Sequence, residues 1–169
     1  MIVEIIKYIQ WYTNTYFFDK KIIGANMRDE WKPEWLIKIG NPHPNVRVTV
    51  ALRELHIALE EKFGEGFIRQ EEPIILINDS QSGYRFDFFV PSENTAIEIC
   101  FSAVKNEFEK DILKAMSDKR VKKLYILARD YYTGRIYYGL RTMQHPGPQS
   151  FISLVSRLGI EVIPEKLSN

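Results

Sequence analysis

The sequence predicts an α/β protein with a mixed central sheet flanked by helices. Residues 46–64 carry apolar side chains at spacings of three and four, which predicts an amphipathic helix that Gly64 ends. Three segments rich in β-branched and aromatic residues follow, at 67–77, 84–90 and 95–101. A second helix and a buried strand come next, at 105–121 and 123–129. The resulting order, α-β-β-β-α-β, is typical of a sheet with helices packed on its faces.

The two ends of the chain add to this core. Residues 1–45 read as an aromatic-rich extension packed on a domain of residues 46–169. Isoleucines at helical spacing predict a first helix that ends near Tyr16, and a short helix is expected around 33–38. At the other end we expect a hairpin over 131–140, a helix at about 149–158 and a strand at 160–163. Pro73 is expected to break the strand at 67–77.

Composition restricts the class of protein. The 169 residues are 45% hydrophobic and 27% charged, with a net charge of +1. These values suit a globular domain, and no apolar run is long enough to span a membrane. The single Cys100 excludes an internal disulfide and fits a reducing cytoplasm. Because the net charge is small, any contact with DNA must come from a local basic patch.

Two apolar strands each carry one carboxylate, Asp87 and Glu98. If the strands form a hairpin with its tip between residues 92 and 93, these two side chains stand opposite each other on one face. Like charges in this position destabilise a sheet, so another group must compensate them. Two interpretations are open. Arg85, Lys105 or solvent could neutralise the acids, or the pair could bind Mg²⁺, which prefers hard oxygen ligands.

The spacing of these acids resembles the motif of the PD-(D/E)xK nuclease superfamily, which includes many restriction endonucleases and archaeal Holliday-junction resolvases. Phe86-Asp87 matches the "PD" and Glu98-Ile99-Cys100 the "(D/E)xK", within residues 46–129. The resemblance implies a restriction-endonuclease-like core and hydrolysis of DNA with Mg²⁺ or Mn²⁺. It implies metal ligation by Asp87, Glu98 and the Ile99 carbonyl. A homodimer would be needed to cut both strands symmetrically.

Cys100 departs from the motif, because it stands where the superfamily has a lysine. That lysine supplies positive charge beside the attacked phosphate, which a thiol cannot. Lys105, five residues later, or Arg85, opposite Cys100 in the assumed register, could replace it. Alternatively, the chain is a catalytically inactive nuclease-fold module that binds DNA or protein. A third alternative is an ion-paired surface on an unrelated α+β fold.

Four further residues are candidates by position. The resemblance implies that Glu54, on the helix 46–64, reaches the metal, and an ion pair of an exposed Glu54 with Arg47 or Arg53 is the alternative. Gln70 lies on the strand before the motif, where it could contact a water or phosphate, although a plain solvated strand position is the favoured interpretation. Lys110 and Lys114 contribute to a basic bias on the helix 105–121, which would suit phosphate contacts or an ordinary solvated helix.

Overall fold

The computed structural model describes residues 1–18, 44–100, 105–129, 131–133 and 136–167. The chain divides into two compact units, Met1–Glu65 and Gly66–Asn169. From the sequence, a boundary is expected between residues 45 and 46. The units meet after Glu65 instead, because the helix that begins at Pro44 belongs to the first unit.

The first unit is helical. Helix α1 (Ile2–Tyr12) buries the four isoleucines whose spacing predicted it. It ends earlier than expected, at Tyr12, and continues into a π-helical segment, η1 (Thr13–Phe18), where the Thr13 hydroxyl donates to the Ile9 carbonyl at 2.8 Å. Helix α3 (Pro44–Phe63) is confirmed, and Gly64 ends it at a φ of +109°. The short helix expected around 33–38 lies outside the described residues.

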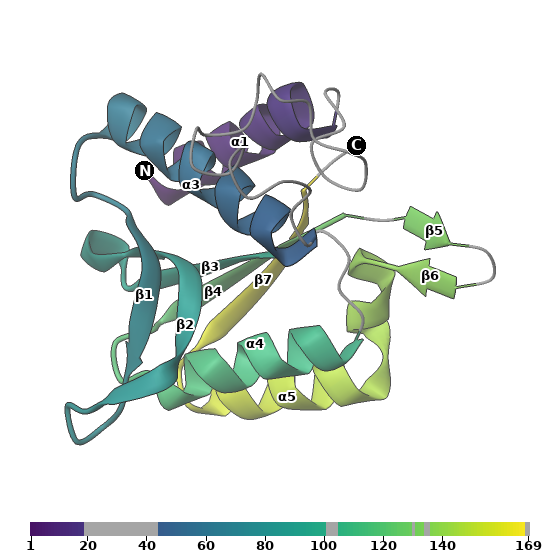
Figure 1. Ribbon diagram of the computed structural model, residues 1–169. Helices are drawn as coiled ribbons and strands as arrows, with labels where there is room; N and C mark the ends of the chain where they lie inside the picture. The colour runs from purple at the N-terminus through teal and green to yellow at the C-terminus, as the bar shows by residue number, and fades with distance from the viewer. Residues whose placement is uncertain (19–43, 101–104, 130, 134–135, 168–169) are drawn as a thin grey trace. The chain divides into compact units, whose positions relative to one another are not determined.

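The second unit contains the expected mixed sheet (Figure 1). Five strands lie in the order β1-β2-β3-β4-β7. The first two pairings are antiparallel and the last two are parallel. The strands are β1 (Arg69–Ile75), β2 (Gln81–Val90), β3 (Thr95–Cys100), β4 (Lys123–Ala128) and β7 (Glu161–Lys166).

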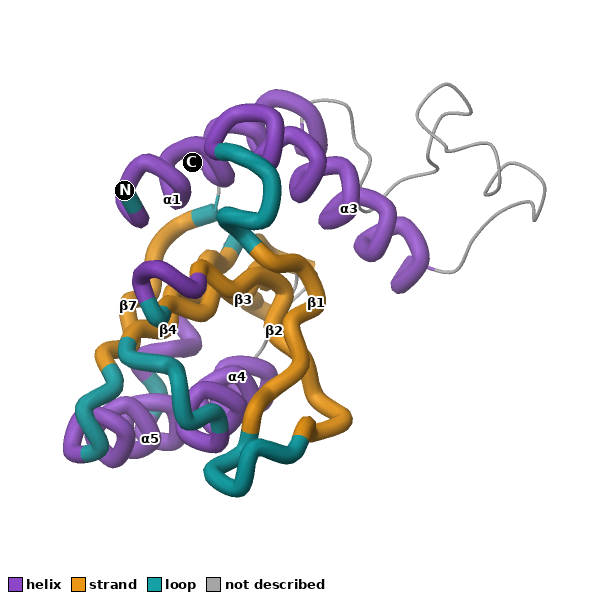
Figure 2. Tube along the Cα trace, turned by 90° about the vertical axis from the view of Figure 1, so that its left-hand side faces the viewer, coloured by secondary structure: helices purple, strands orange, loops and turns teal. Residues whose placement is uncertain are grey.

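Helices α4 (Lys105–Ser117) and α5 (Pro146–Arg157) lie side by side on one face of this sheet (Figures 1 and 2). Helix α4 buries Phe108, Ile112 and Ala115 there, together with residues of the strands. The structure therefore follows the predicted order α-β-β-β-α-β from α3 to β4. Helix α5 begins three residues earlier than expected, because proline is well suited to a first helical turn. The remaining elements are η3 (Pro91–Glu93), β5 (Tyr131–Thr133), β6 (Ile136–Tyr138) and η4 (Leu140–Gln144).

Strand β1 does not break at Pro73, contrary to expectation. Pro73 pairs with Arg85, and the register shifts just after it. Because β1 is the edge strand, proline removes no ladder hydrogen bond that the sheet needs. The end of β1 is instead tied to the segment after α4: the Ile75 amide donates to the Asp118 carboxylate at 2.9 Å, and Ile75 accepts from the Lys119 amide.

Candidate active site

The pairing of β2 with β3 ends just before the two carboxylates. Their pairs are those that the sequence predicts, Val90–Thr95, Phe89–Ala96 and Phe88–Ile97. Asp87 and Glu98 are the next residues in this register. At this point the Ile99 amide donates to Asp87 Oδ2 at 2.8 Å. The side chain of Asp87 thus takes a hydrogen bond from β3 where the described ladder ends, and this fixes its carboxylate beside Glu98.

Lys114 on α4 brings an ammonium group to this pair. Its Nζ donates to Glu98 Oε1 and to the Arg85 carbonyl oxygen, the latter at 3.1 Å. The side chains of Lys114 and Glu98 are only 11% and 5% exposed, so their ion pair is almost entirely removed from water. From the sequence, Lys114 is expected to contribute to a basic surface. In the structure its ammonium forms an ion pair with Glu98.

Asp111 adds a third carboxylate that the sequence analysis did not single out. Its Oδ1 lies 3.1 Å from Lys114 Nζ, and its Oδ2 accepts from the Cys100 thiol at 3.5 Å. Asp111 is buried, and it lies on the same face of α4 as Phe108 and Ile112. Cys100 is therefore a donor to Asp111, and Lys114 supplies the positive charge of this cluster.

The carboxylates are held in an environment that favours their protonated forms. Burial raises the pKa of Glu98 well above its ordinary value, and the neighbouring charges of Asp87 and Asp111 raise it further, against the opposing effect of Lys114. Burial also raises the pKa of Asp87, although the hydrogen bond from Ile99 and the interaction with Glu98 act in the opposite direction.

The remaining groups respond to the same surroundings. Burial raises the pKa of Asp111 to about 6, with Lys114 opposing the shift. Burial disfavours the charged form of Lys114, but the charges of Glu98 and Asp111 outweigh it and raise its pKa, so the ammonium stays protonated at neutral pH. Burial and the nearby acids raise the pKa of Cys100, which keeps its thiol neutral.

The other residues predicted from the sequence lie elsewhere or are not described. Arg85 is exposed, and its guanidinium donates to the Glu71 carbonyl at 2.9 Å instead of lying at Cys100. The Lys105 side chain lies outside the described residues. Gln70 is half-buried on β1, where it pairs with Phe88. Glu54 belongs to the first unit, where it is exposed on α3. Burial raises the pKa of Tyr12, and the charge of Glu54 adds to this shift.

The donor chemistry around Asp87 and Glu98 fits a hard cation. Two carboxylates and the Ile99 carbonyl are oxygen ligands, and Mg²⁺ commonly uses one or two carboxylates while keeping several waters. Within the described part of the chain, no group of three or more His, Cys, Asp or Glu side chains is arranged to hold a metal. A cation bound here would depend on water or on a substrate phosphate to complete its coordination.

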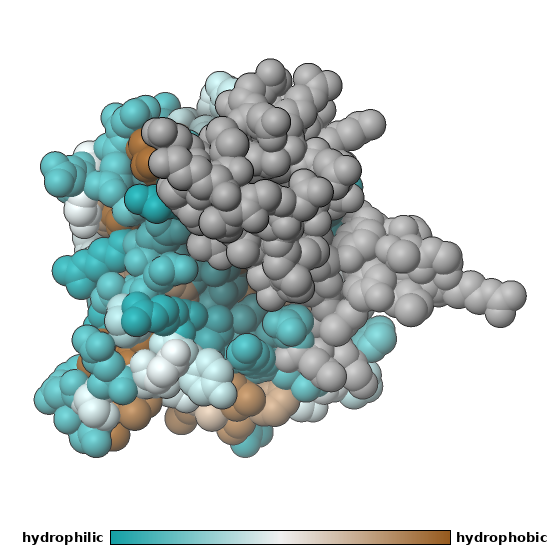
Figure 3. Space-filling model, in the orientation of Figure 1, coloured by the Kyte–Doolittle hydropathy of each residue, from teal (hydrophilic) through white to brown (hydrophobic). Residues whose placement is uncertain are grey.

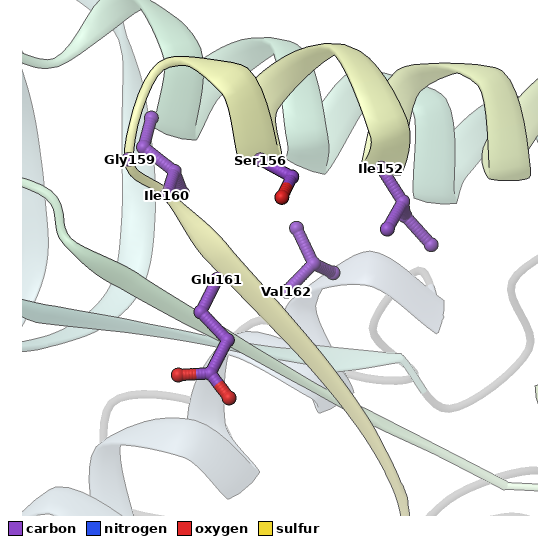
Figure 4. Close-up of a pocket in the computed structure, with 6 residues that line it drawn as sticks. All are labelled: Ile152, Ser156, Gly159, Ile160, Glu161 and Val162. Atoms are coloured by element: carbon purple, nitrogen blue, oxygen red, sulfur yellow. The ribbon is translucent and has the colours of Figure 1, made fainter.

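Among the described residues, two cavities of the second unit can be compared with the candidate site. One, of about 290 Å³, has Lys114 in its wall, and the ammonium of this residue contacts Glu98. The other, of about 260 Å³, lies between the end of α5 and the start of β7 (Figure 4). Ile152, Ser156 and Val162 point toward one another there, and the Glu161 carboxylate points away. This second cavity is at the opposite end of the parallel strands from Cys100 and has no part in the candidate site.

A scan of the chain against protein-family models, a search of curated proteins and a search of solved structures each returned no match. Among the described residues, no helix is long and apolar enough to cross a membrane.

Proposed function

We propose that the protein is a metal-dependent endonuclease that hydrolyses DNA phosphodiester bonds, with a PD-(D/E)xK-like core. One observation carries the proposal: the ammonium of Lys114 contacts Glu98. Glu98 and Asp87 each lie one position beyond the last β2–β3 pair, Phe88–Ile97, on their strands. Two acids and a cation converge from β2, β3 and α4, in an α-β-β-β-α-β context. Lys114 thus supplies the charge that Cys100 cannot, in place of Lys105 or Arg85.

The roles of the residues follow from their contacts. Asp87 and Glu98, with the Ile99 carbonyl, would hold Mg²⁺ or Mn²⁺, and such an ion polarises a phosphodiester and lowers the pKa of a bound water. The Ile99 amide orients the Asp87 carboxylate. Lys114 stays charged at neutral pH and can stabilise the negative charge that develops on a phosphate during in-line attack. A homodimer would let two such sites cut both strands.

A second candidate is an inactive nuclease-fold module that binds DNA or protein. The observation that favours it is the burial of Glu98 in an ion pair with Lys114, because a balanced pair of this kind needs no metal for its stability. In that case the cluster is a structural ion-pair network, and binding surfaces elsewhere carry the function.

A cleavage assay separates the two candidate functions. It compares wild type with Asp87→Ala on supercoiled plasmid and on a branched DNA. Each protein is assayed in Mg²⁺, in Mn²⁺ and in EDTA. The endonuclease proposal predicts cutting that requires metal and that Asp87→Ala abolishes. Binding of either DNA without cutting would refute the endonuclease and support the inactive module.

A further inference from the structure

The cavity beside Lys114 is built between the β1–β2 hairpin and α4, and we name it the hairpin–helix pocket. Its volume is about 290 Å³, at the lower end of the range for small-molecule sites. In Figure 3, brown hydrophobic areas alternate with teal hydrophilic ones along the lower part of the face, where α4 lies. The pocket is lined by Ile74, Leu76, Ser82, Tyr84, Lys110, Leu113, Lys114 and Ser117.

The walls of this pocket combine three kinds of group. Tyr84, which is 59% exposed as a residue, contributes an aromatic ring, and Leu113 adds an exposed apolar residue. The Lys110 ammonium lies 5.6 Å from the centre of the Tyr84 ring. The Ser82 hydroxyl accepts from the Tyr84 amide at 3.2 Å, and a hydroxyl that accepts one bond still has a proton to donate. A flat, apolar, hydrogen-bonding group with a nearby negative charge matches this lining.

A nucleotide has this chemistry. Its base can stack on Tyr84 and against Leu113, and its phosphate is complementary in charge to Lys110 and Lys114. Lys114 belongs both to the pocket wall and to the ion pair with Glu98, so a base in the pocket is attached to a phosphate close to the candidate active site. A base that is stacked and paired inside a duplex cannot enter such a pocket without leaving the stack.

We infer that the hairpin–helix pocket receives the base of an unpaired nucleotide adjoining the phosphate at the carboxylate site. The substrate is then DNA with an unpaired nucleotide, such as a bulge, a flap or a branch, in preference to a perfect duplex. The inference rests on the proposed function for the position of the phosphate, but the pocket is tested without any cutting.

The test is binding of two fluorescent DNA duplexes in EDTA, followed by anisotropy. They are identical except that one carries a single extra, unpaired nucleotide. Wild type is compared with Tyr84→Ala, which removes the ring, and with the matched control Tyr84→Phe, which keeps it. Tyr84 is largely exposed, so neither change should disturb the fold.

The inference predicts that wild type and Tyr84→Phe bind the duplex with the unpaired nucleotide about tenfold more tightly, as expected for stacking of one base on an aromatic ring. Tyr84→Ala should lose this preference and keep its affinity for the paired duplex. Equal binding of the two duplexes by wild type, or a preference that survives in Tyr84→Ala, would overturn it. The plasmid assay with Asp87→Ala tests the endonuclease separately, so failure of one proposal is distinguishable from failure of the other.

Discussion

Lys114→Met removes the cation from the buried cluster and keeps most of the side-chain volume. The ammonium contacts Glu98 and Asp111, and the Lys114 side chain is only 11% exposed. Removing one partner of a buried ion pair costs about 3–5 kcal/mol, because the other charge is left without compensation. Protonation of the acids limits this cost, since each unit by which a pKa rises corresponds to about 1.4 kcal/mol.

The loss of stability should therefore depend on pH. The folded-state pKa values of Glu98 and Asp111 already lie above their ordinary values, so ionisation of these acids weakens the fold as pH rises. Without Lys114 both pKa values rise further, and the difference between variant and wild type grows with pH. We expect a loss of about 3 kcal/mol or more at pH 8 and of about 1 kcal/mol at pH 5, where Asp111, with its pKa of about 6, is mostly protonated.

Urea denaturation in metal-free buffer at the two pH values measures this difference. Lys110→Met is the matched control, because Lys110 lies one turn away on α4 and is exposed, so its loss should change the free energy of unfolding by less than about 0.5 kcal/mol. An equal loss at pH 5 and pH 8 for Lys114→Met would refute the electrostatic account of the cluster.

Three further predictions concern the surroundings of the site. Cys100→Ala should change the cleavage rate by no more than about threefold, because the buried thiol stays neutral; a loss of a hundredfold or more would assign chemistry to the sulfur. The affinity for Mg²⁺, measured by calorimetry, should rise with pH, because Asp87 and Glu98 have raised pKa values and must lose protons to bind the ion. A flat profile would contradict this ligand set. Arg120→Ala should lower the free energy of unfolding by about 2–3 kcal/mol. The reason is that Arg120 donates to Glu72 and to buried Asp118 and lies over the ring of Phe89. Chemical denaturation that shows no change would indicate that this network does not stabilise the fold.

The strands and their register could be predicted from the sequence because local signals determine them. Alternating apolar residues and the turn after Val90 are enough to place Asp87 beside Glu98, and the observed pairs follow that register. The mixed sheet and the helices around it follow from the order of the elements. The extent of β1 was misjudged at Pro73, because proline's effect depends on whether a strand lies at the edge of its sheet.

The residue that we propose in place of the motif lysine could not be found by proximity in the sequence. Lys105 and Arg85 are close to Glu98 in sequence or in the assumed ladder, whereas Lys114 reaches it from α4 by the packing of that helix on the sheet. A signal was nevertheless present. Asp111 occupies the apolar stripe of α4, three residues after Phe108 and three before Lys114, and a buried acid in such a stripe requires a partner.

The most direct test of the central claim is a single-turnover cleavage assay in Mg²⁺ that compares Lys114→Met with Arg85→Met and Lys105→Met, after circular dichroism confirms that each is folded. If Lys114 supplies the catalytic charge, its loss should slow cutting by a factor of about 100–1,000, while each of the other two changes should slow it by no more than about fivefold. Cleavage by Lys114→Met at the wild-type rate would contradict the account, and a large loss in Arg85→Met or Lys105→Met alone would move the role to that residue.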